Sequence, residues 1–513
     1  MDLETTTTYG DLRGSRDNDA VVFCGIPYAR PPIGPLRFAP PEPPEPWSGI
    51  REATTFGPAA MQPASPILGT SLASSEDCLT LNVWTPAVDD SRRPVLVWFH
   101  GGAYITGTGS SGSFHGAIMA RRGDVVVVTL NYRLGLFGYL RGIDICDGLP
   151  STGNEGLLDQ LAALAWVKEQ IAAFGGNPDN VTVFGQSAGA GSIAAMLAMP
   201  RARGLFHKAI LQSGSAMTLQ TPAAANRVME AILADAQLAP HEAARLRDLP
   251  AAQLLDIQTR VTPRAAGGLY RPVADGKEIP ADPLGAIASG SSAGIPVLIG
   301  TNLEERKFFR PIDPEVESLT DEGLLAQLSG ARMDAKVGDD VVFDPSKAVA
   351  VYRQARSGRG ESITPQELWL AIVSDRRYRV PAMLLAELQS AHTPDTYAYL
   401  FTWQSPAWDG LLGAGHNVEI PFVFGTLDAP DSQYFVPAGS PVGKLPTQIQ
   451  DAWIAFARTG NPQTPQLLGW EAYSASRRCT MLLGPSCGPV NAPYEAERQF
   501  WATAVGGAAR AGI

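Results

Sequence analysis

The sequence predicts an α/β protein with a large, mostly parallel central sheet that is flanked by helices. Residues 94–100 (PVLVWFH) and 125–130 (VVVVTL) are continuous apolar runs, which are typical of parallel strands buried on both faces. A third strand is expected at 181–184 (VTVF), where β-branched residues predominate. Before it, apolar residues repeat at helical spacing: Leu157, Leu161, Leu164, Val167 and Ile171. Strands and helices therefore alternate as in βαβ units.

The later part of the chain continues this pattern with longer interruptions. Further strands are expected at 208–212, 296–300 and 397–403. The intervals of roughly 220–290 and 312–392 are more polar and mainly helical in pattern, so we expect them to be cap insertions over one end of the sheet. One α/β domain spanning residues 1–513, with helical cap insertions, explains the sequence better than separate domains joined by linkers.

Composition and charge exclude several classes of partner. The net charge of −11 argues against a nucleic-acid or anionic-membrane surface. No run of eighteen apolar residues is present, and the N-terminal segment MDLETTTTYGDLRG lacks the basic and apolar regions of a signal peptide. We therefore expect a cytoplasmic protein without a nucleic-acid or membrane partner. A small-molecule substrate and a monomer or small homo-oligomer are separate expectations.

The cysteines predict neither a disulfide framework nor a metal site. They are odd in number and scattered, without a C-x-x-C pair or a zinc-like spacing: Cys24, Cys78, Cys146, Cys479 and Cys487. This pattern favours reduced thiols in a cytoplasm. No metal and no organic cofactor is expected.

The strongest functional signal is the G-x-S-x-G segment at 185–189 (GQSAG). It follows the strand expected at 181–184 and precedes AGSIAAMLAM, whose small apolar residues suit a closely packed helix. A strand, a sharp turn between glycines and a helix are the context of a nucleophile elbow. Ser187 is therefore the predicted nucleophile, with a helix N-terminus behind it.

A second segment, 290–294 (GSSAG), matches the same pattern and serves as an internal control. No strand leads into Ser292, and the apolar run IPVLIG follows it where a helix should begin. We therefore predict that Ser292 lies in a loop before a strand and is not a nucleophile.

A serine nucleophile needs a base and an orienting carboxylate, which follow it in the order acid, then histidine, on an α/β-hydrolase sheet. His392 and His416 are the two histidines after residue 300, and His416 lies in a glycine-rich loop after the strand expected at 397–403. That position favours His416, because loops at strand carboxyl ends carry catalysis in open α/β sheets. Glu304 and Glu305 both follow the strand expected at 296–300, and spacing alone does not choose between them. One would orient the imidazole and the other would be a solvated surface charge.

An oxyanion hole requires backbone N–H groups that point at the developing negative charge. The segment VWFHGGAYITG places Gly101 and Gly102 directly after a central strand, as in the HGG-type loops of esterases, although an ordinary tight turn has the same pattern. Ala188, the residue after the nucleophile, would supply another N–H group.

These segments resemble the type-B carboxylesterase and cholinesterase family of α/β-hydrolases over almost the whole chain. FGGNPDNVTVFGQSAG at 174–189 and EDCLTLNVWTP at 76–86 fit two signatures of that family. FCGIPYARPPIGPLRF, NYRLGLFGYL, ILQSGSA and GHNVEIPFVFG are similar to family segments in the same order. Within the family, the chain most resembles the bacterial para-nitrobenzyl-esterase type.

The resemblance implies a role for individual residues. Laid on GTNLEERKFF, the family's acid motif assigns the triad acid to Glu305, and the family histidine falls on His416. The oxyanion donors become Gly102, Ala103 and Ala188, with Gly101 shaping the turn. Phe309 falls on a position that often lines the acyl or alcohol pocket. Five further side chains are candidates for the pocket but are equally explained by core or rim packing: Leu68, Tyr104, Trp403, Trp408 and Leu412.

Three departures from the family are informative. Secreted members pair the cysteine at the Cys78 position with an upstream cysteine, but Ala60 stands there, so Cys78 should be a free thiol. The loop 61–77 contains no aromatic residue, which argues against choline esters, since cholinesterases keep a tryptophan there that stacks on quaternary ammonium. Gln186 precedes the nucleophile where many relatives carry glutamate, and this change does not translate into a specificity.

The resulting prediction is a serine carboxylesterase that forms an acyl-enzyme through Ser187, His416 and Glu305. The alternative is hydrolysis of an amide or carbamate by the same three residues. A more remote alternative is a non-catalytic binding module, because some relatives of this family lack the nucleophile or its base.

Overall fold

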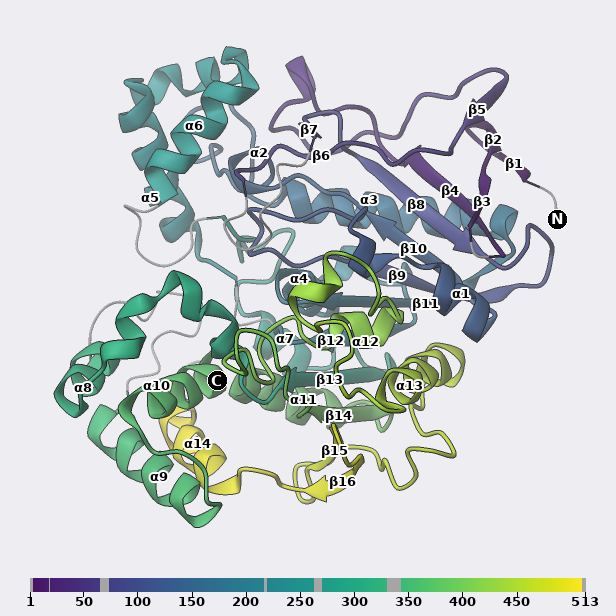
Figure 1. Cartoon of the computed structure of the whole chain (residues 1–513). Coiled ribbons are helices and arrows are strands. Elements are labelled where there is room, and N and C mark those ends of the chain that lie inside the picture. Colours follow the sequence, from purple (N-terminus) through teal and green to yellow (C-terminus); the bar gives the residue numbers. More distant parts are fainter. Residues whose placement is uncertain are drawn as a thin grey trace.

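The computed structural model describes residues 3–17, 19–64, 73–215, 219–262, 270–329 and 343–509, and a large mixed sheet runs through its centre (Figure 1). The order of the eleven described strands is β16-β15-β14-β13-β12-β11-β9-β10-β8-β4-β3. Their bounds are β3 Ser15–Asp17, β4 Ala20–Pro27, β8 Thr80–Thr85, β9 Arg93–Phe99, β10 Val126–Leu130, β11 Gly176–Gln186, β12 Lys208–Gln212, β13 Val297–Asn302, β14 Thr396–Phe401, β15 Cys479–Leu483 and β16 Gly488–Asn491. The predicted α/β class is confirmed.

The centre of the sheet is parallel and its margins are antiparallel. Every neighbouring pair from β10 through β9, β11, β12, β13 and β14 to β15 is parallel, whereas β8, β4, β3 and β16 join by antiparallel pairing. Parallel strands point their carboxyl ends to the same edge, so the loops after β9, β11, β13 and β14 open at that edge. These loops carry the candidate site residues.

Helices cover both faces of the sheet, as the continuous apolar strands require. On β9, Val95 and Val97 belong to one buried cluster, and Leu96 and Trp98 belong to the cluster on the opposite face. The first cluster includes side chains of α3 (Glu155–Gln170) and α4 (Ala188–Ala198). The second includes side chains of α1 (Ala117–Gly123), α12 (Ile420–Phe424) and α13 (Leu445–Thr459). The shorter helix α2 (Gly135–Tyr139) packs on the α3 side.

The two polar intervals contain most of the remaining helices, and Figure 1 shows α5, α6, α8, α9 and α10 on one side of the sheet. Residues 220–290 include α5 (Pro222–Ala236), α6 (Ala251–Val261) and α7 (Pro283–Ala288). Residues 312–392 include α8 (Asp321–Ser329), α9 (Pro345–Gly358), α10 (Pro365–Ser374), a π-helical turn (Asp375–Arg379) and α11 (Val380–Ser390). The last of these does not belong to a cap, because α11 packs against β13 and β14.

The second interval has an apolar core of its own, to which the C-terminal helix α14 (Glu495–Ala509) contributes. The indole of Trp501 on α14 donates a hydrogen bond to the Tyr352 hydroxyl on α9 at 2.8 Å. That hydroxyl donates in turn to Asp375 at 2.5 Å. The last helix is therefore linked, through α9, to the turn that follows α10 within the same interval.

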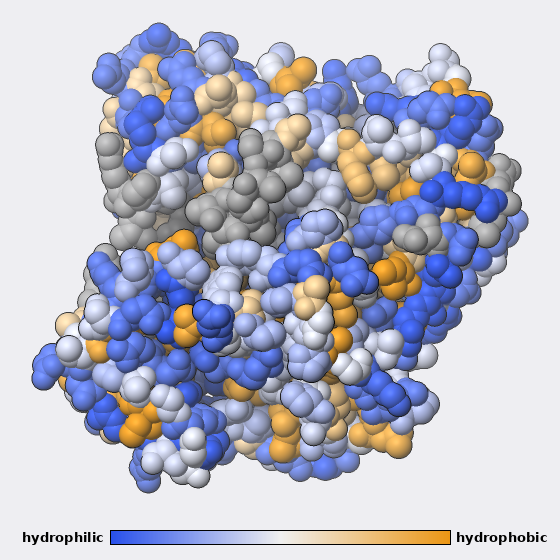
Figure 2. Space-filling view, in the orientation of Figure 1, coloured by the Kyte–Doolittle hydropathy of each residue, from blue (hydrophilic) through white to orange (hydrophobic). Residues whose placement is uncertain are grey.

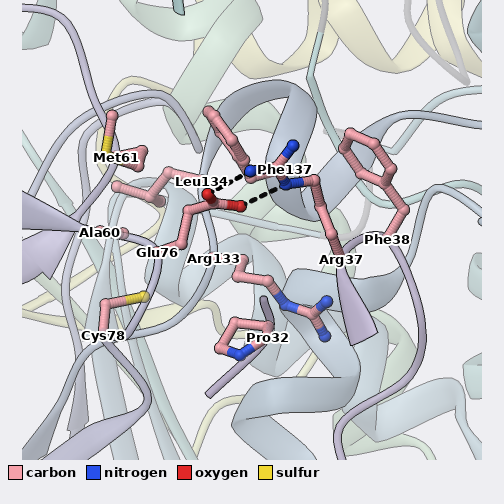
Figure 3. A pocket seen from close by; sticks show the side chains of 10 residues that line it. All are labelled: Pro32, Arg37, Phe38, Ala60, Met61, Glu76, Cys78, Arg133, Leu134 and Phe137. Carbon is pink, nitrogen blue, oxygen red and sulfur yellow. Dashed lines mark hydrogen bonds and ion pairs between the residues drawn. The ribbon is translucent and has the colours of Figure 1, made fainter. Parts of the chain in front are cut away.

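The N-terminal part forms two small sheets and a proline-rich segment at residues 27–46. In the first sheet β2 (Gly10–Arg13) lies between β1 (Glu4–Thr7) and β5 (Ile50–Glu52), and in the second β6 (Ala59–Ala60) pairs with β7 (Ser74–Ser75). The Arg37 guanidinium fastens the proline-rich segment to Glu76 through two hydrogen bonds of 2.6 and 2.5 Å, beside the buried thiol of Cys78 (Figure 3). Cys78 is unpaired as predicted, and burial raises the pKa of its thiol far above the ordinary range.

The surface drawn in Figure 2 is mainly polar, as the composition of the chain leads one to expect. Figure 2 shows a mainly hydrophilic face on which hydrophobic side chains are scattered. Within the ranges given above, no helix combines the length and the hydropathy that crossing a bilayer requires.

Candidate active site

The nucleophile elbow has the predicted form. Strand β11 ends at Gln186, Ser187 forms the turn, and α4 begins at Ala188. Ser187 has φ 55° and ψ −117°, a combination that non-glycine residues rarely adopt and that is typical of strained functional positions. Its N–H donates to the Gln212 carbonyl at 2.8 Å, and its carbonyl accepts from the Gly191 N–H at 2.9 Å. The turn is therefore held from both sides.

The glycine at 189 is required by close approach of the backbone. A Cβ at Gly189 would lie 1.9 Å from the Phe99 carbonyl oxygen, far inside van der Waals contact. A Cβ at Gly185 would lie 2.8 Å from the same oxygen. The two glycines thus allow the elbow to pack against the end of β9. The loop that contains Gly101 and Gly102, called the glycine loop below, begins at this point.

Glu305 and His416 meet at the carboxyl edge of the sheet. The Glu305 Oε2 lies 2.5 Å from His416 Nδ1, and both side chains are buried. The other carboxylate oxygen, Oε1, accepts hydrogen bonds from the Ser213 hydroxyl at 2.5 Å and from the Asn302 N–H at 2.7 Å. A carboxylate with three donors is held in one orientation, and it fixes the Nδ1–H tautomer of the imidazole.

His392, the other candidate for the base, lies on the surface. His392 is exposed, and its Nε2 lies 2.6 Å from the Ala288 carbonyl oxygen. This position agrees with the choice of His416 over His392 from the sequence.

The second imidazole nitrogen points to the elbow. His416 Nε2 lies 3.0 Å from Nε2 of Gln186, the residue that precedes Ser187. With Nδ1 protonated, Nε2 is an acceptor, so the Gln186 amide donates to it. Sequence analysis found no meaning for Gln186, and the contact shows one: this side chain meets the ring atom that would take the serine proton.

The glycine loop lies directly against the elbow. A Cβ at Gly101 would lie 2.7 Å from the Gln186 amide oxygen and 3.1 Å from the Ser187 Cβ. Gly102 has φ 113°, and a Cβ there would lie 2.0 Å from the Thr106 carbonyl oxygen, so only glycine fits. Ala103 follows with φ 57°. The loop is therefore a specially shaped turn beside the serine, as an oxyanion hole requires.

A neutral histidine supports this loop. The ring of His100 stacks on Tyr132 with centroids 4.4 Å apart, and its Nδ1 lies 2.8 Å from the Gly101 carbonyl oxygen. Burial lowers the pKa of His100 from 6.5 to about 4, so the ring is uncharged at neutral pH and Nδ1 donates to that carbonyl. Sequence analysis treated His100 only as part of the glycine motif.

Aromatic side chains surround His416. Ring centroids lie 4.9 Å away for Tyr378, 5.7 Å for Phe309 and 6.1 Å for Phe308. Phe309 was predicted here, whereas Tyr378 was not, because it comes from the π-helical turn Asp375–Arg379 of the second interval. Such turns often occur at functional sites, but sequence periodicity does not reveal them.

The other pocket candidates occupy different positions. Trp403 and Leu412 are buried within the apolar cluster on the α13 face, and Trp403 packs on Phe422. Tyr104 is buried against Tyr139 in the opposite cluster, and Trp408 stacks on Phe308. Leu68 lies outside the described residues. Of these side chains, Trp408 is the one that extends the aromatic group around His416.

A second buried carboxyl group lies below the histidine loop. Glu419 accepts hydrogen bonds from Asn302 at 2.6 Å and from Gln212 at 3.2 Å. Burial, reinforced by the negative charge of Glu305, raises the pKa of Glu419 from 4.5 to about 7. Sequence analysis missed this residue, although an acidic residue three positions after His416 in GHNVEIPF was a visible signal.

The control segment behaves as predicted. Ser292 is buried in the turn before β13, and its hydroxyl donates to the Gln389 amide oxygen at 2.6 Å. No cluster of three or more potential metal-ligating His, Cys, Asp or Glu side chains occurs in the described part of the chain.

A sharp strand–serine–helix turn at the carboxyl edge of a mostly parallel sheet defines an α/β-hydrolase. The model of the carboxylesterase family matches residues 2–501, and the chain therefore belongs to that family. It is accordingly a carboxylic-ester hydrolase.

Individual relatives match over nearly their full length. The para-nitrobenzyl esterase of Bacillus subtilis is 39% identical over 503 residues, which cover 96% of this chain and 97% of that protein. A phenmedipham hydrolase of Pseudarthrobacter oxydans is 36% identical, covering 93% of this chain and 94% of that protein. Among solved structures, the carboxylesterase of Geobacillus stearothermophilus at pH 6.2 superimposes with a TM-score of 0.87 at 39% identity, covering 98% of this chain and all of the other.

Proposed function

We propose that this protein is a serine carboxylesterase in which Ser187 is the nucleophile, His416 the general base and Glu305 the orienting carboxylate. The observation that carries the proposal is the buried Glu305–His416 pair at 2.5 Å, whose second ring nitrogen lies 3.0 Å from the Gln186 side chain at the end of β11. Family membership supports the reaction class. The presence of all three residue types of the triad, at Ser187, His416 and Glu305, disfavours a non-catalytic binding module.

The reaction would proceed in two stages. His416 Nε2 takes the proton of Ser187 as its oxygen attacks the ester carbonyl, and Glu305 stabilises the imidazolium that forms. The N–H groups of Gly102, Ala103 and Ala188 would hold the oxyanion of the tetrahedral intermediate. His416 then protonates the departing alcohol, and water activated by the same nitrogen releases the acid from the acyl-enzyme.

The substrate in this proposal is a small-molecule ester. The aromatic rings of Phe309 and Tyr378 beside His416 favour an apolar acyl or alcohol group, since such rings bind apolar surface well. The para-nitrobenzyl esterase among the relatives is consistent with this preference. The cytoplasmic location and the monomeric or small homo-oligomeric state stay predictions.

The test compares Ser187→Ala with a matched control, Ser292→Ala. On a series of p-nitrophenyl esters, Ser187→Ala should lower kcat by about 10⁴-fold or more, because the nucleophile is lost. Ser292→Ala should keep the wild-type kcat to within about twofold, and a fluorophosphonate probe should label this variant but not Ser187→Ala. Activity within tenfold of wild type in Ser187→Ala would contradict the proposal.

Hydrolysis of amides or carbamates by the same residues is the alternative. An anilide and a carbamate matched to the best p-nitrophenyl ester in their acyl parts distinguish these functions. We expect kcat/KM to be highest for the ester. A higher value for the anilide or the carbamate would replace the ester as the preferred substrate class.

A further inference from the structure

The carboxylate beside the triad acid is engaged with the loop that carries His416. The Glu304 N–H donates to the Ala414 carbonyl at 2.9 Å, and the Ala414 N–H donates to Glu304 Oε2 at 3.0 Å. Both backbone polar groups of Ala414 are thus bound by one residue. Ala414 lies two positions before His416, so these two hydrogen bonds fix the backbone of the segment that leads to the proposed base.

The loop is shaped around the Glu304 side chain. Gly413 has φ 53°, and a Cβ at this position would lie 2.4 Å from Glu304 Oε2. The carboxylate therefore occupies the space that any other residue at 413 would need. Its side chain is 21% exposed, so the expectation that the second glutamate is a solvated surface charge is wrong.

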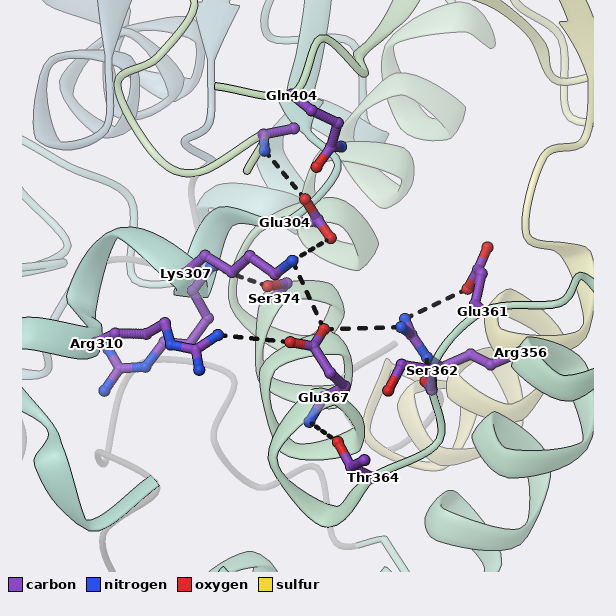
Figure 4. A network of polar contacts seen from close by, with 12 residues as sticks. Glu304, Lys307, Arg310, Arg356, Glu361, Ser362, Thr364, Glu367, Ser374 and Gln404 are labelled. Atoms are coloured by element: carbon purple, nitrogen blue, oxygen red, sulfur yellow. Dashed lines mark hydrogen bonds and ion pairs between the residues drawn. The ribbon is translucent and has the colours of Figure 1, made fainter. Parts of the chain in front are cut away.

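An ion-pair network fixes the other oxygen of this carboxylate. Lys307 Nζ lies 2.7 Å from Glu304 Oε1 and 3.7 Å from Glu367 Oε2 on α10, and Figure 4 shows Lys307 between the two acids. Glu367 lies 3.5 Å from Arg310 and 3.8 Å from Arg356 on α9. The helices of the second interval thereby support Glu304 from the side opposite Ala414.

We infer that Glu304 is a positioning residue for the general base, and this inference rests on the proposed function. The two adjacent carboxylates have different roles, since Glu305 orients the imidazole ring and Glu304 holds the backbone from which the ring projects. Lys307 keeps the Glu304 carboxylate in place, so α9 and α10 contribute to the placement of His416 through side chains that need not contact the substrate.

The chemical consequence concerns the rate of proton transfer. A base that is displaced by about 1 Å from the serine hydroxyl can lose about 10²-fold in rate without any change in substrate binding. Loss of the Glu304 contacts should therefore lower kcat and leave KM unchanged. If Glu304 were purely stabilising, its loss would instead lower the melting temperature and the fraction of folded enzyme, and kcat for each active site would stay the same.

The experiment measures kcat per titrated serine for Glu304→Ala, Glu304→Gln and a matched control, Glu361→Ala. Glu361 pairs with Arg356 and Arg359 in the same network but is bonded to a different part of the chain from Ala414. We expect Glu304→Ala to lower kcat about 10- to 100-fold with KM within about twofold. Glu304→Gln keeps an oxygen that can accept from Ala414 and should recover most of kcat, and Glu361→Ala should match the wild type.

Several results would overturn the inference. They are a kcat in Glu304→Ala within twofold of wild type, an equal loss in Glu304→Gln, or an equal loss in Glu361→Ala. If Glu304→Ala does not fold, Gly413→Ala displaces the same carboxylate and takes its place in the comparison. A wild-type enzyme without Ser187-dependent esterase activity would refute the proposed function instead, so the two failures are distinguishable.

Discussion

Two segments of this chain carry the same five-residue pattern, and their surroundings differ in every respect that matters for chemistry. Ser187 follows a central strand, has a strained backbone, and adjoins Gln186, whose amide reaches His416. Ser292 lies in a turn before β13, where its hydroxyl is bonded to the amide of Gln389. Of the two segments, only the one at Ser187 follows a central strand and lies beside a buried imidazole, which is why Ser187 is the proposed nucleophile.

The two serines also differ in the charge of their neighbourhood. Around Ser187 the structure gathers the buried carboxyl groups of Glu305 and Glu419 with an imidazole. Around Ser292 the hydrogen-bonding partners are neutral: the Gln389 amide reaches the Ile295 carbonyl and the Thr393 hydroxyl as well. The first arrangement suits proton transfer, and the second stabilises a turn.

The largest difference should follow from changing Glu305, which orients His416, and Gln389, which binds the Ser292 hydroxyl. Glu305→Gln should lower kcat by about 10³- to 10⁴-fold, because the imidazole loses the carboxylate that fixes its tautomer. Gln389→Ala should leave kcat within about twofold and lower the free energy of unfolding by about 1–3 kcal/mol, because buried carbonyl and hydroxyl groups lose their partner. Ester kinetics and urea unfolding of both variants test the pair, and a large loss of kcat in Gln389→Ala would remove the distinction.

The last glycine of each segment gives the next contrast. Gly189→Ala should lower the free energy of unfolding by about 3 kcal/mol or more, because its Cβ would lie 1.9 Å from the Phe99 carbonyl oxygen. No atom lies within 4 Å of a Cβ at Gly294, so Gly294→Ala should cost only about 1 kcal/mol for its φ of 80°. Equal midpoints of urea unfolding for the two variants would contradict this interpretation of the elbow.

A smaller effect is expected in the pH dependence of stability, which should differ between the charged surroundings of Ser187 and the neutral surroundings of Ser292. Because the pKa of Glu419 is about 7 in the folded state against 4.5 ordinarily, the folded protein binds more protons between these values. Its stability relative to Glu419→Gln should therefore fall from pH 5 to pH 8, by on the order of 3 kcal/mol. Urea unfolding at the two pH values measures this fall.

The Ser292 neighbourhood supplies the control for that measurement. Gln389→Ala should show the same pH dependence as the wild type, because no titrating group is changed there. A difference between wild type and Glu419→Gln that is the same at pH 5 and pH 8 would show that Glu419 does not titrate in this window.

The sequence alone predicted the central strands and the candidate residues that lie at their carboxyl ends. The apolar runs predicted β9, β10 and β13, and the elbow at Ser187 followed from a strand, two glycines and a helix in register. His416 was separated from His392 because it follows a strand. These inferences depend on local patterns, which the chain carries in consecutive residues.

What sequence reasoning missed depends on contacts between distant residues. Gln186 meets His416 across 230 positions, and Tyr378 reaches the same ring from an irregular helical turn. Spacing did not choose between Glu304 and Glu305, because both follow β13 and only the folded loop shows which one faces the imidazole. Trp403 and Leu412 were candidates for the pocket, but both side chains are buried in the apolar cluster on the α13 face, because the sequence does not show side-chain direction.

The backbone of Ser187 has a consequence for engineering. A residue held at φ 55° and ψ −117° keeps the folded state less stable than a relaxed turn would, by about 1–3 kcal/mol. Stabilising screens that ignore activity would therefore favour replacements that let this turn relax, and would select against Ser187, the proposed nucleophile. Libraries for a more heat-resistant esterase should hold position 187 constant and look for stability in the N-terminal sheets and the outer helices.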